Sequence, residues 1–201
     1  MGTLLYRRRY MGGVKGLPYD AEVEYLESDG TQYINTGIIP TNTIGVEISI
    51  LYSNSKNVLI GGGNAWSQEF LIARDGKSII FNANHSSGTR ISRGNSYAGS
   101  QHIYKYENGD CYIDGELVGT NSPSIPTTTK TLCVLCYNRN SGQGEFLVGK
   151  LYYVKILNNG VLQRDLIPVR VGTIGYMYDK ISGTLFGNSG TGSFILGPDK
   201  T

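Results

Sequence analysis

The chain has 201 residues, of which 39% are hydrophobic and 17% are charged, and its formal net charge is +2. This length fits one globular domain, and a charge so close to neutral argues against a dedicated nucleic-acid-binding protein, which concentrates basic residues on one face. Glycine is abundant at 28 residues while proline is scarce at 6, which indicates many tight turns rather than a disordered or collagen-like chain.

Residues 1–20 read as an arm that precedes a folded domain, which we expect to cover residues 21–201. The arm mixes apolar and basic side chains, and we expect seven of them to dock on a partner: Leu4, Leu5, Tyr6, Arg7, Arg8, Arg9 and Tyr10. Residues 1–13 lack the apolar core of a secretory signal. No stretch has the ~20 apolar residues that span a bilayer, so we expect cytoplasmic synthesis and no membrane span.

The first predicted strand, EVEYLE at 22–27, spaces three glutamates much like the E-x-D-x-x-E catalytic cluster of β-sandwich glucanases. In such enzymes one carboxylate attacks the sugar and a second donates a proton, which requires a separation of about 5 Å. On a regular strand Glu22 and Glu24 would share one face about 7 Å apart, while Glu27 would face the other way. The pattern therefore favours an edge strand whose glutamates discourage edge-to-edge pairing.

Short runs of β-branched and aromatic residues follow, and glycine-containing pairs typical of hairpin turns separate many of them. We predict an N-terminal group of strands, a meander with turns at Asn108-Gly109 and Asp114-Gly115, two central strands that are apolar on both faces, and a late hairpin. These elements cover 46–52, 57–60, 69–73 and 78–82, then 102–119, then 131–137 and 145–157, and finally 175–186. In the first run, Val46, Ile48 and Ile50 share one face of the strand, as expected of a strand covered on one side. No window shows a helical stripe, so the sequence predicts an all-β fold.

The motifs that could carry metal, redox or phosphate chemistry are incomplete. Cys133 and Cys136 form a C-x-x-C pair, but residues i and i+3 of a strand face opposite sides, so we expect two small core hydrophobes. His85 and His102 lack the spacing of a zinc site or a catalytic triad, and no EF-hand loop is present. GNSGTG at 187–192 is not followed by a helix that could bind phosphate. We expect no catalytic residue, no metal and no cofactor.

The strongest ligand signal lies between the early strands. The only tryptophan, Trp66, occupies a glycine-rich stretch, and a long polar segment follows at 82–97. Sugar recognition uses aromatic faces together with polar groups that bind hydroxyls. We therefore predict a ligand site made of Trp66, Asn84, His85 and Arg90. The alternative is that Trp66 serves only as a packing plug.

Four segments carry a family resemblance, at 25–41, 112–119, 149–170 and 175–198, and the most specific are YLESDGTQYINTG and YDKISGTLFGNSGTGSFILGP. Together they resemble the laminin-G-like, concanavalin A-like jelly-roll domains of phage and prophage structural proteins of gut bacteria. The resemblance covers about residues 22–198 and implies a two-sheet antiparallel β-sandwich used for carbohydrate or protein attachment. Enzymes of this broad fold carry their carboxylates on a middle strand of the concave sheet, whereas EVEYLE aligns with the first strand.

These observations lead us to expect a non-catalytic virion structural protein, a capsid- or tail-associated module for assembly and for surface or carbohydrate attachment. Its partners would be other virion proteins, bound through the arm in a homo- or hetero-oligomeric assembly, together with a host-surface glycan as the candidate ligand. Nucleic acid is not an expected partner. Two alternatives stay open: a glycan-binding lectin at the bacterial cell surface, which requires export, and a β-glucanase.

Overall fold

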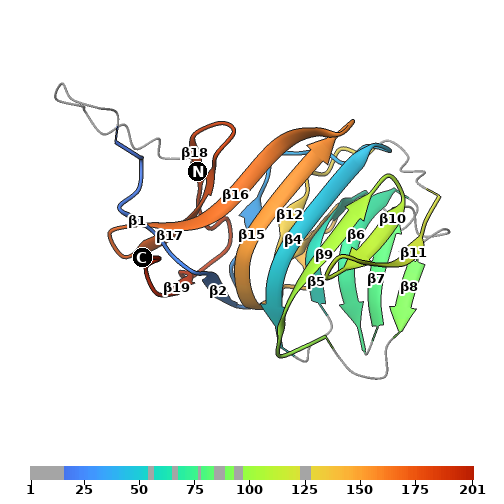
Figure 1. Ribbon diagram of the computed structural model, residues 1–201, viewed down its shortest axis with the longest axis horizontal. Coiled ribbons are helices and arrows are strands. Elements are labelled where there is room, and N and C mark those ends of the chain that lie inside the picture. Colours follow the sequence, from blue (N-terminus) through green and yellow to red (C-terminus); the bar gives the residue numbers. More distant parts are fainter. Residues whose placement is uncertain are drawn as a thin grey trace.

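The computed structural model describes residues 16–53, 57–64, 68–76, 78–83, 89–92, 97–122 and 128–201, with the backbone alone at 89, 90 and 92. Over these residues the chain folds into strands of two sheets (Figure 1), which confirms the predicted all-β class. In the described ranges, no helix has the length and apolar character needed to cross a membrane. The predicted docking residues of the arm lie outside the described residues: Leu4, Leu5, Tyr6, Arg7, Arg8, Arg9 and Tyr10.

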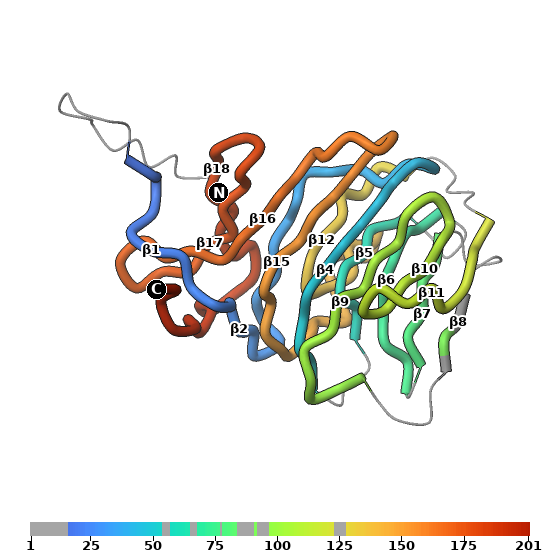
Figure 2. The backbone as a smooth tube through the Cα atoms, viewed as in Figure 1, coloured from blue at the N-terminus to red at the C-terminus, as the bar shows by residue number. Residues whose placement is uncertain are grey.

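The larger sheet contains 11 strands, all paired antiparallel. Along its main path the order is β11 (Glu116–Thr120), β10 (Asp110–Ile113), β9 (Gln101–Glu107), β4 (Ile44–Tyr52), β15 (Val148–Asn158), β16 (Val161–Val171), β17 (Ile174–Asp179) and β18 (Thr184–Phe186). Off this path, β1 (Ala21–Glu22) pairs with β16, while β2 (Leu26–Asp29) pairs with both β15 and β19 (Ile195–Leu196). The first and last strands of the domain are therefore part of one sheet (Figure 2).

The smaller sheet contains eight strands, which lie behind the larger sheet in the view of Figure 1. Its path is β14 (Gly142–Gly144), β13 (Tyr137–Arg139), β5 (Asn57–Gly63), β6 (Glu69–Asp75), β7 (Ser78–Ala83) and β8 (Thr89–Ser92). The short β12 (Cys133–Val134) pairs with β5 and with β3 (Ile34–Asn35). β13 runs parallel to β5, and the other pairs are antiparallel.

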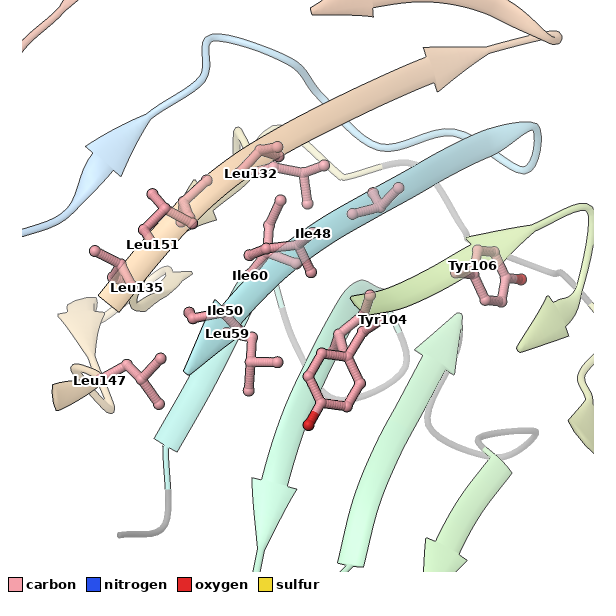
Figure 3. Packing of buried hydrophobic residues seen from close by; sticks show 14 of the residues in the cluster. Ile48, Ile50, Leu59, Ile60, Tyr104, Tyr106, Leu132, Leu135, Leu147 and Leu151 are labelled. Atoms are coloured by element: carbon pink, nitrogen blue, oxygen red, sulfur yellow. The ribbon is translucent and has the colours of Figure 1, made fainter. Parts of the chain in front are cut away.

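One apolar core joins the two sheets (Figure 3). Ile48 and Ile50 of β4 enter it from the larger sheet, and Leu59 and Ile60 of β5 enter it from the smaller one, all with no exposed surface. Their alternation on β4 matches the predicted inward face. Because each such side chain contributes about 1.5–3 kcal/mol when fully buried, this shared core is the main force that holds the sheets together.

The meander at 102–119 is confirmed by its backbone angles. Both central residues of each turn have positive φ, at 52° and 96° in Asn108-Gly109 and at 52° and 83° in Asp114-Gly115. Two consecutive positive φ values define the type I′ turn, whose twist matches that of paired strands. These turns connect β9 to β10 and β10 to β11.

The prediction of one strand at EVEYLE is wrong. β1 ends at Glu22 and β2 begins at Leu26, because Val23 turns into the core and pairs with Asp199 near the end of the chain. Glu22 then lies 3.7 Å from Lys200, while Glu27 lies 3.9 Å from Lys150. The carboxylates have separate partners, and Glu27 belongs to a strand paired on both sides rather than to an edge.

The prediction of one continuous strand at 131–137 is also wrong. β12 ends at Val134 and β13 begins at Tyr137, and Leu135 between them has a φ of 70°. A left-handed residue cannot continue a strand, so the chain changes direction there. The apolar run predicted the burial of this segment but not its shape. By contrast, β15 is central as expected, with β4 and β2 or β16 as neighbours.

The loop 187–192, near the end of the domain, is hydrogen-bonded to residues 31–33 near its beginning. Asn188 Oδ1 accepts hydrogen bonds from Tyr33 N at 3.2 Å and from Gly190 N at 2.8 Å, and Thr191 N donates to Thr31 O at 3.1 Å. A Cβ at Gly190 would collide with the carbonyl oxygen of Thr31, so only glycine permits this approach.

A second tie in this region is the fully buried carboxylate of Asp179 at the end of β17. It accepts hydrogen bonds from Asp165 N at 2.9 Å, from Ile181 N at 3.2 Å and from the Ser182 hydroxyl at 2.7 Å. Arg164 Nη1 lies 3.5 Å away, and the same guanidinium donates from Nε to Thr36 O at 3.2 Å. One buried charge thus shapes the turn after β17 and joins it to the segment before β4.

We expect Asp179→Ala to lower the free energy of unfolding by about 3 kcal/mol, because it removes one partner of a buried charge pair and leaves several backbone donors unmet. Urea unfolding of the purified variant measures this loss. Asp199→Ala is the matched control, since Asp199 also pairs with an arginine, at 2.6 Å, but on the surface. A loss in Asp179→Ala no larger than in the control would contradict the assignment.

Candidate functional site

The described part of the chain does not show the predicted ligand residues as one site. Trp66, Asn84 and His85 lie outside the described residues, and Arg90 is described only as a backbone position of β8 paired with Ile80. The strand ends nevertheless locate their segments. Gly63, where β5 ends, pairs with Glu69, and Ala83, where β7 ends, pairs with Phe70. The segments that carry Trp66 and Asn84 therefore leave the sheet from neighbouring strand ends.

At this end of the sheet lies a buried carboxylate, Glu69, with no exposed surface. Asn82 Nδ2 of β7 donates to Glu69 Oε1 at 2.6 Å, and the hydroxyl of Tyr137 of β13 donates to Glu69 Oε2. Glu69 is the first residue of β6, and β6 is an inner strand of the sheet, between β5 and β7. We call these three residues the Glu69 cluster.

The Glu69 cluster lies on the face of the smaller sheet that points away from the larger sheet. Phe70 and Ile72 of β6 enter the shared core, so the alternate residues Glu69 and Leu71 face the other way. This face carries a second apolar cluster, made of Val58, Leu71, Ala73 and Tyr137 with Ile80 packed against it. The carboxylate itself has no contact with solvent.

This environment fixes the protonation and the orientation of the neighbouring groups. Burial, and next the hydrogen bond to Glu69, raise the pKa of Tyr137 well above its ordinary value, so the phenol stays protonated and remains a donor. Because Asn82 must donate its Nδ2 to a carboxylate, its Oδ1 points elsewhere, and this buried atom has no hydrogen-bond partner in the described part of the chain. A buried unmet acceptor costs about 1–3 kcal/mol.

Amide and hydroxyl side chains also form hydrogen bonds with one another near the end of β5. Asn64, just after β5, accepts through Oδ1 from Thr128 Oγ1 at 3.3 Å and from Thr129 Oγ1 at 3.1 Å. Asn138 of β13 donates to Thr131 O at 2.9 Å. The Oδ1 of Asn138 also accepts from Gln143 Nε2 at 3.2 Å, so both ends of this amide have partners.

A cation borders the cluster as well. The guanidinium of Arg139 lies 4.9 Å from the centre of the Tyr137 ring and pairs with Glu145 at 2.7 Å. Arginine stacked on an aromatic ring in this way holds both groups in place.

The outer face of the larger sheet is a second surface rich in tyrosine and charge, but its groups satisfy one another. Glu47 lies in register between Lys105 and Lys155 on the adjacent strands. Lys155 Nζ is 3.2 Å from Glu47 and 5.3 Å from the ring centre of Tyr153, whose hydroxyl donates to Glu47 at 3.0 Å. Lys155 therefore covers this ring as Arg139 covers the ring of Tyr137. The Glu69 cluster differs in that its carboxylate is fully buried and that Asn82 beside it keeps an oxygen with no described partner.

The remaining residues singled out in the sequence have structural partners. His102 of β9 lies with Nδ1 2.6 Å from Asp114 Oδ2, and Ile103 N donates to the other oxygen of Asp114 at 2.9 Å, which ties the meander together. Within the described ranges, no group of three or more His, Cys, Asp or Glu side chains could hold a metal ion.

The sequence did not single out Glu69. Its only signal in the sequence was a carboxylate at the start of the apolar run EFLIA.

We expect Tyr137→Phe to lower the free energy of unfolding by about 1–3 kcal/mol, because it removes a donor from a buried carboxylate. Chemical unfolding measures this, with Tyr153→Phe as a control whose hydroxyl also binds a glutamate but in a half-exposed place. In a Glu69→Gln background the loss should shrink, since the charged acceptor is gone. An unchanged loss there would show that the hydroxyl of Tyr137 acts on another group.

A comparison with models of known protein families finds no match, and a comparison with curated proteins finds no relative. The function must therefore be argued from the residues and their geometry.

Proposed function

We propose that this protein is a non-catalytic attachment module of a phage particle, a capsid- or tail-associated structural protein of the concanavalin A-like, laminin-G-like sandwich type. The observation that carries the proposal is the Glu69 cluster, a fixed buried carboxylate at the strand ends from which the segments with Trp66 and Asn84 leave. The family resemblance of the opening and closing motifs supplies the virion context.

Several features of this end of the sheet favour binding of a glycan. Its strands are held by a core that two sheets share, so polar groups at their ends are positioned before a ligand arrives. The buried Oδ1 of Asn82, which no group in the described ranges satisfies, suits a sugar hydroxyl, because a hydroxyl can donate a hydrogen bond. In this proposal Trp66 covers an apolar sugar face, while Asn84, His85 and Arg90 bind hydroxyls.

One observation favours a second candidate, a β-glucanase. Glu69 lies on a middle strand, the kind of position at which enzymes of this broad fold carry carboxylates, whereas EVEYLE does not. Retaining hydrolysis needs two carboxylates about 5 Å apart, one to attack and one to donate a proton. The two described partners of Glu69 are instead an amide and a phenol, which orient a carboxylate without replacing the second acid.

The arm of residues 1–20 supports the assembly part of the proposal. Its last residues are fixed to the domain, because Tyr19 packs edge-on against Tyr178 at 5.0 Å and Asp20 N donates to Arg170 O at 2.9 Å. The arm therefore starts from a fixed point on the domain, and in this proposal Leu4, Leu5, Tyr6 and the three arginines dock on a neighbouring subunit.

The ligand part is tested with an array of host capsular polysaccharides and β-glucans. Trp66→Ala should weaken binding by about 1–3 kcal/mol, the loss of one aromatic anchor, with little change in the free energy of unfolding. Tyr25→Ala, just before β2, serves as the control and should bind normally. A stability loss without a binding loss would identify Trp66 as a packing plug. Release of reducing ends that Glu69→Gln abolishes would favour the glucanase.

The assembly part is tested by deleting residues 2–15. The melting temperature should stay nearly unchanged, because the described strands and their core begin after this segment. Incorporation into particles, measured after co-expression with the neighbouring capsid and tail proteins, should be lost. Replacing only the three arginines with alanine separates the charge contribution from the apolar one. A deletion variant that enters particles as efficiently as the full chain would refute docking through the arm.

A further inference from the structure

The strand break between β12 and β13 brings together two cysteines that a regular strand would keep apart. β12 runs antiparallel to β5, with Cys133 paired to Gly61, whereas β13 runs parallel to β5, with Tyr137 paired to the same Gly61. The chain therefore leaves this position and returns to it within four residues. Leu135 makes the reversal possible with its φ of 70°.

Backbone hydrogen bonds hold this reversal in place. Leu135 N donates to Leu59 O at 2.8 Å, and Leu147 N donates to Leu135 O at 2.8 Å. Residues i and i+3 across such a tight turn have Cα atoms within about 7 Å, which overlaps the range that a disulfide requires. Cys133 and Cys136 occupy these two positions. The expected burial of both cysteines is confirmed, but the continuous strand that would put them on opposite faces is absent.

The two thiols also interact directly. Both are fully buried, and a hydrogen bond between them is the main cause that lowers the pKa of Cys133 and raises that of Cys136. Thr131 adds a further hydrogen bond to Cys133. Cys133 therefore has the greater thiolate character, which is the state that attacks a disulfide.

We propose that Cys133 and Cys136 form a redox-active dithiol, which closes to an intramolecular disulfide by exchange with a small soluble disulfide such as oxidised glutathione. This proposal does not rest on the attachment function proposed above. Cys133 belongs to β12, which pairs with both β5 and β3, and it lies opposite Asn35 of β3.

The exchange proceeds in two steps. The Cys133 thiolate attacks one sulfur of glutathione disulfide, the S–S bond breaks, and one glutathione thiolate leaves. Cys136 then loses its proton to that thiolate and attacks the Cys133 sulfur, which expels the second glutathione. Two cysteine thiols are oxidised, one disulfide is reduced to two thiols, and the two protons end on glutathione. Because both thiols are buried, the reaction requires local opening and is expected to be slow.

The test measures the equilibrium constant for disulfide formation against glutathione, by acid quenching, thiol alkylation and mass spectrometry. The folded protein should have a constant at least about tenfold larger than the chain in concentrated urea, because the fold already holds the two residues across a turn. Refolding from urea in the same redox buffer removes the access barrier, so that slow opening cannot hide the result.

The third cysteine provides the matched control. Cys111 of β10 is equally buried, and burial raises its pKa to about 12, but it lies in the other sheet. Cys111→Ser should form the disulfide normally, whereas Cys133→Ser and Cys136→Ser should abolish it. An equal or smaller constant in the folded state, a cross-link that includes Cys111, or a stable glutathione adduct on the wild-type pair would overturn the proposal.

Discussion

Burial of the smaller sheet on both of its faces is the constraint on which the rest of this structure depends. One face packs on the larger sheet, and the other carries its own cluster of buried side chains, Val58, Leu71, Ala73 and Tyr137. A polar group in such a sheet cannot obtain hydrogen bonds from solvent, so each one must find a protein partner or lose free energy. This explains why the carboxylate of Glu69 is fixed by groups from β7 and β13.

The sequence predicted those parts of the fold that depend on neighbouring residues. Alternation along 46–52 and the paired positive-φ residues at Asn108-Gly109 are local signals, and both were confirmed. The breaks in 22–27 and 131–137 were missed because their causes are distant. Val23 turns inward to meet Asp199, and the reversal at Leu135 is held by carbonyl and amide groups of residues 59 and 147. Leucine is a rare residue at positive φ, so nothing in the run TLCVLCY indicates a turn.

In the candidate site, too, local features could be predicted and contacts between distant residues could not. Polar segments between strands could be recognised from composition, which is how Trp66 and Asn84 were chosen. Glu69 could not, because a glutamate at the start of an apolar strand usually faces water, and its donor Tyr137 lies 68 positions away in the sequence. Only the arrangement of β13 beside β5 makes their meeting predictable. The role of Asn82 likewise could not be predicted, because it depends on a hydrogen bond to Glu69 on the neighbouring strand.

The two fully buried carboxylates, Asp179 and Glu69, argue for different roles. Asp179 receives hydrogen bonds from backbone and hydroxyl groups of its own turn, the arrangement expected where a charge serves to shape the chain. Glu69 is instead held by side chains from two other strands, and one of these, Asn82, keeps a buried oxygen that no described group satisfies. An unmet acceptor costs free energy in an apolar layer, and Tyr106 Oη of β9 is a second buried atom without a partner in the described ranges. The missing bond therefore does not by itself separate the two carboxylates. Glu69 differs from Asp179 in its place at the strand ends where the polar segments begin, and this place is the reason for proposing the ligand site there.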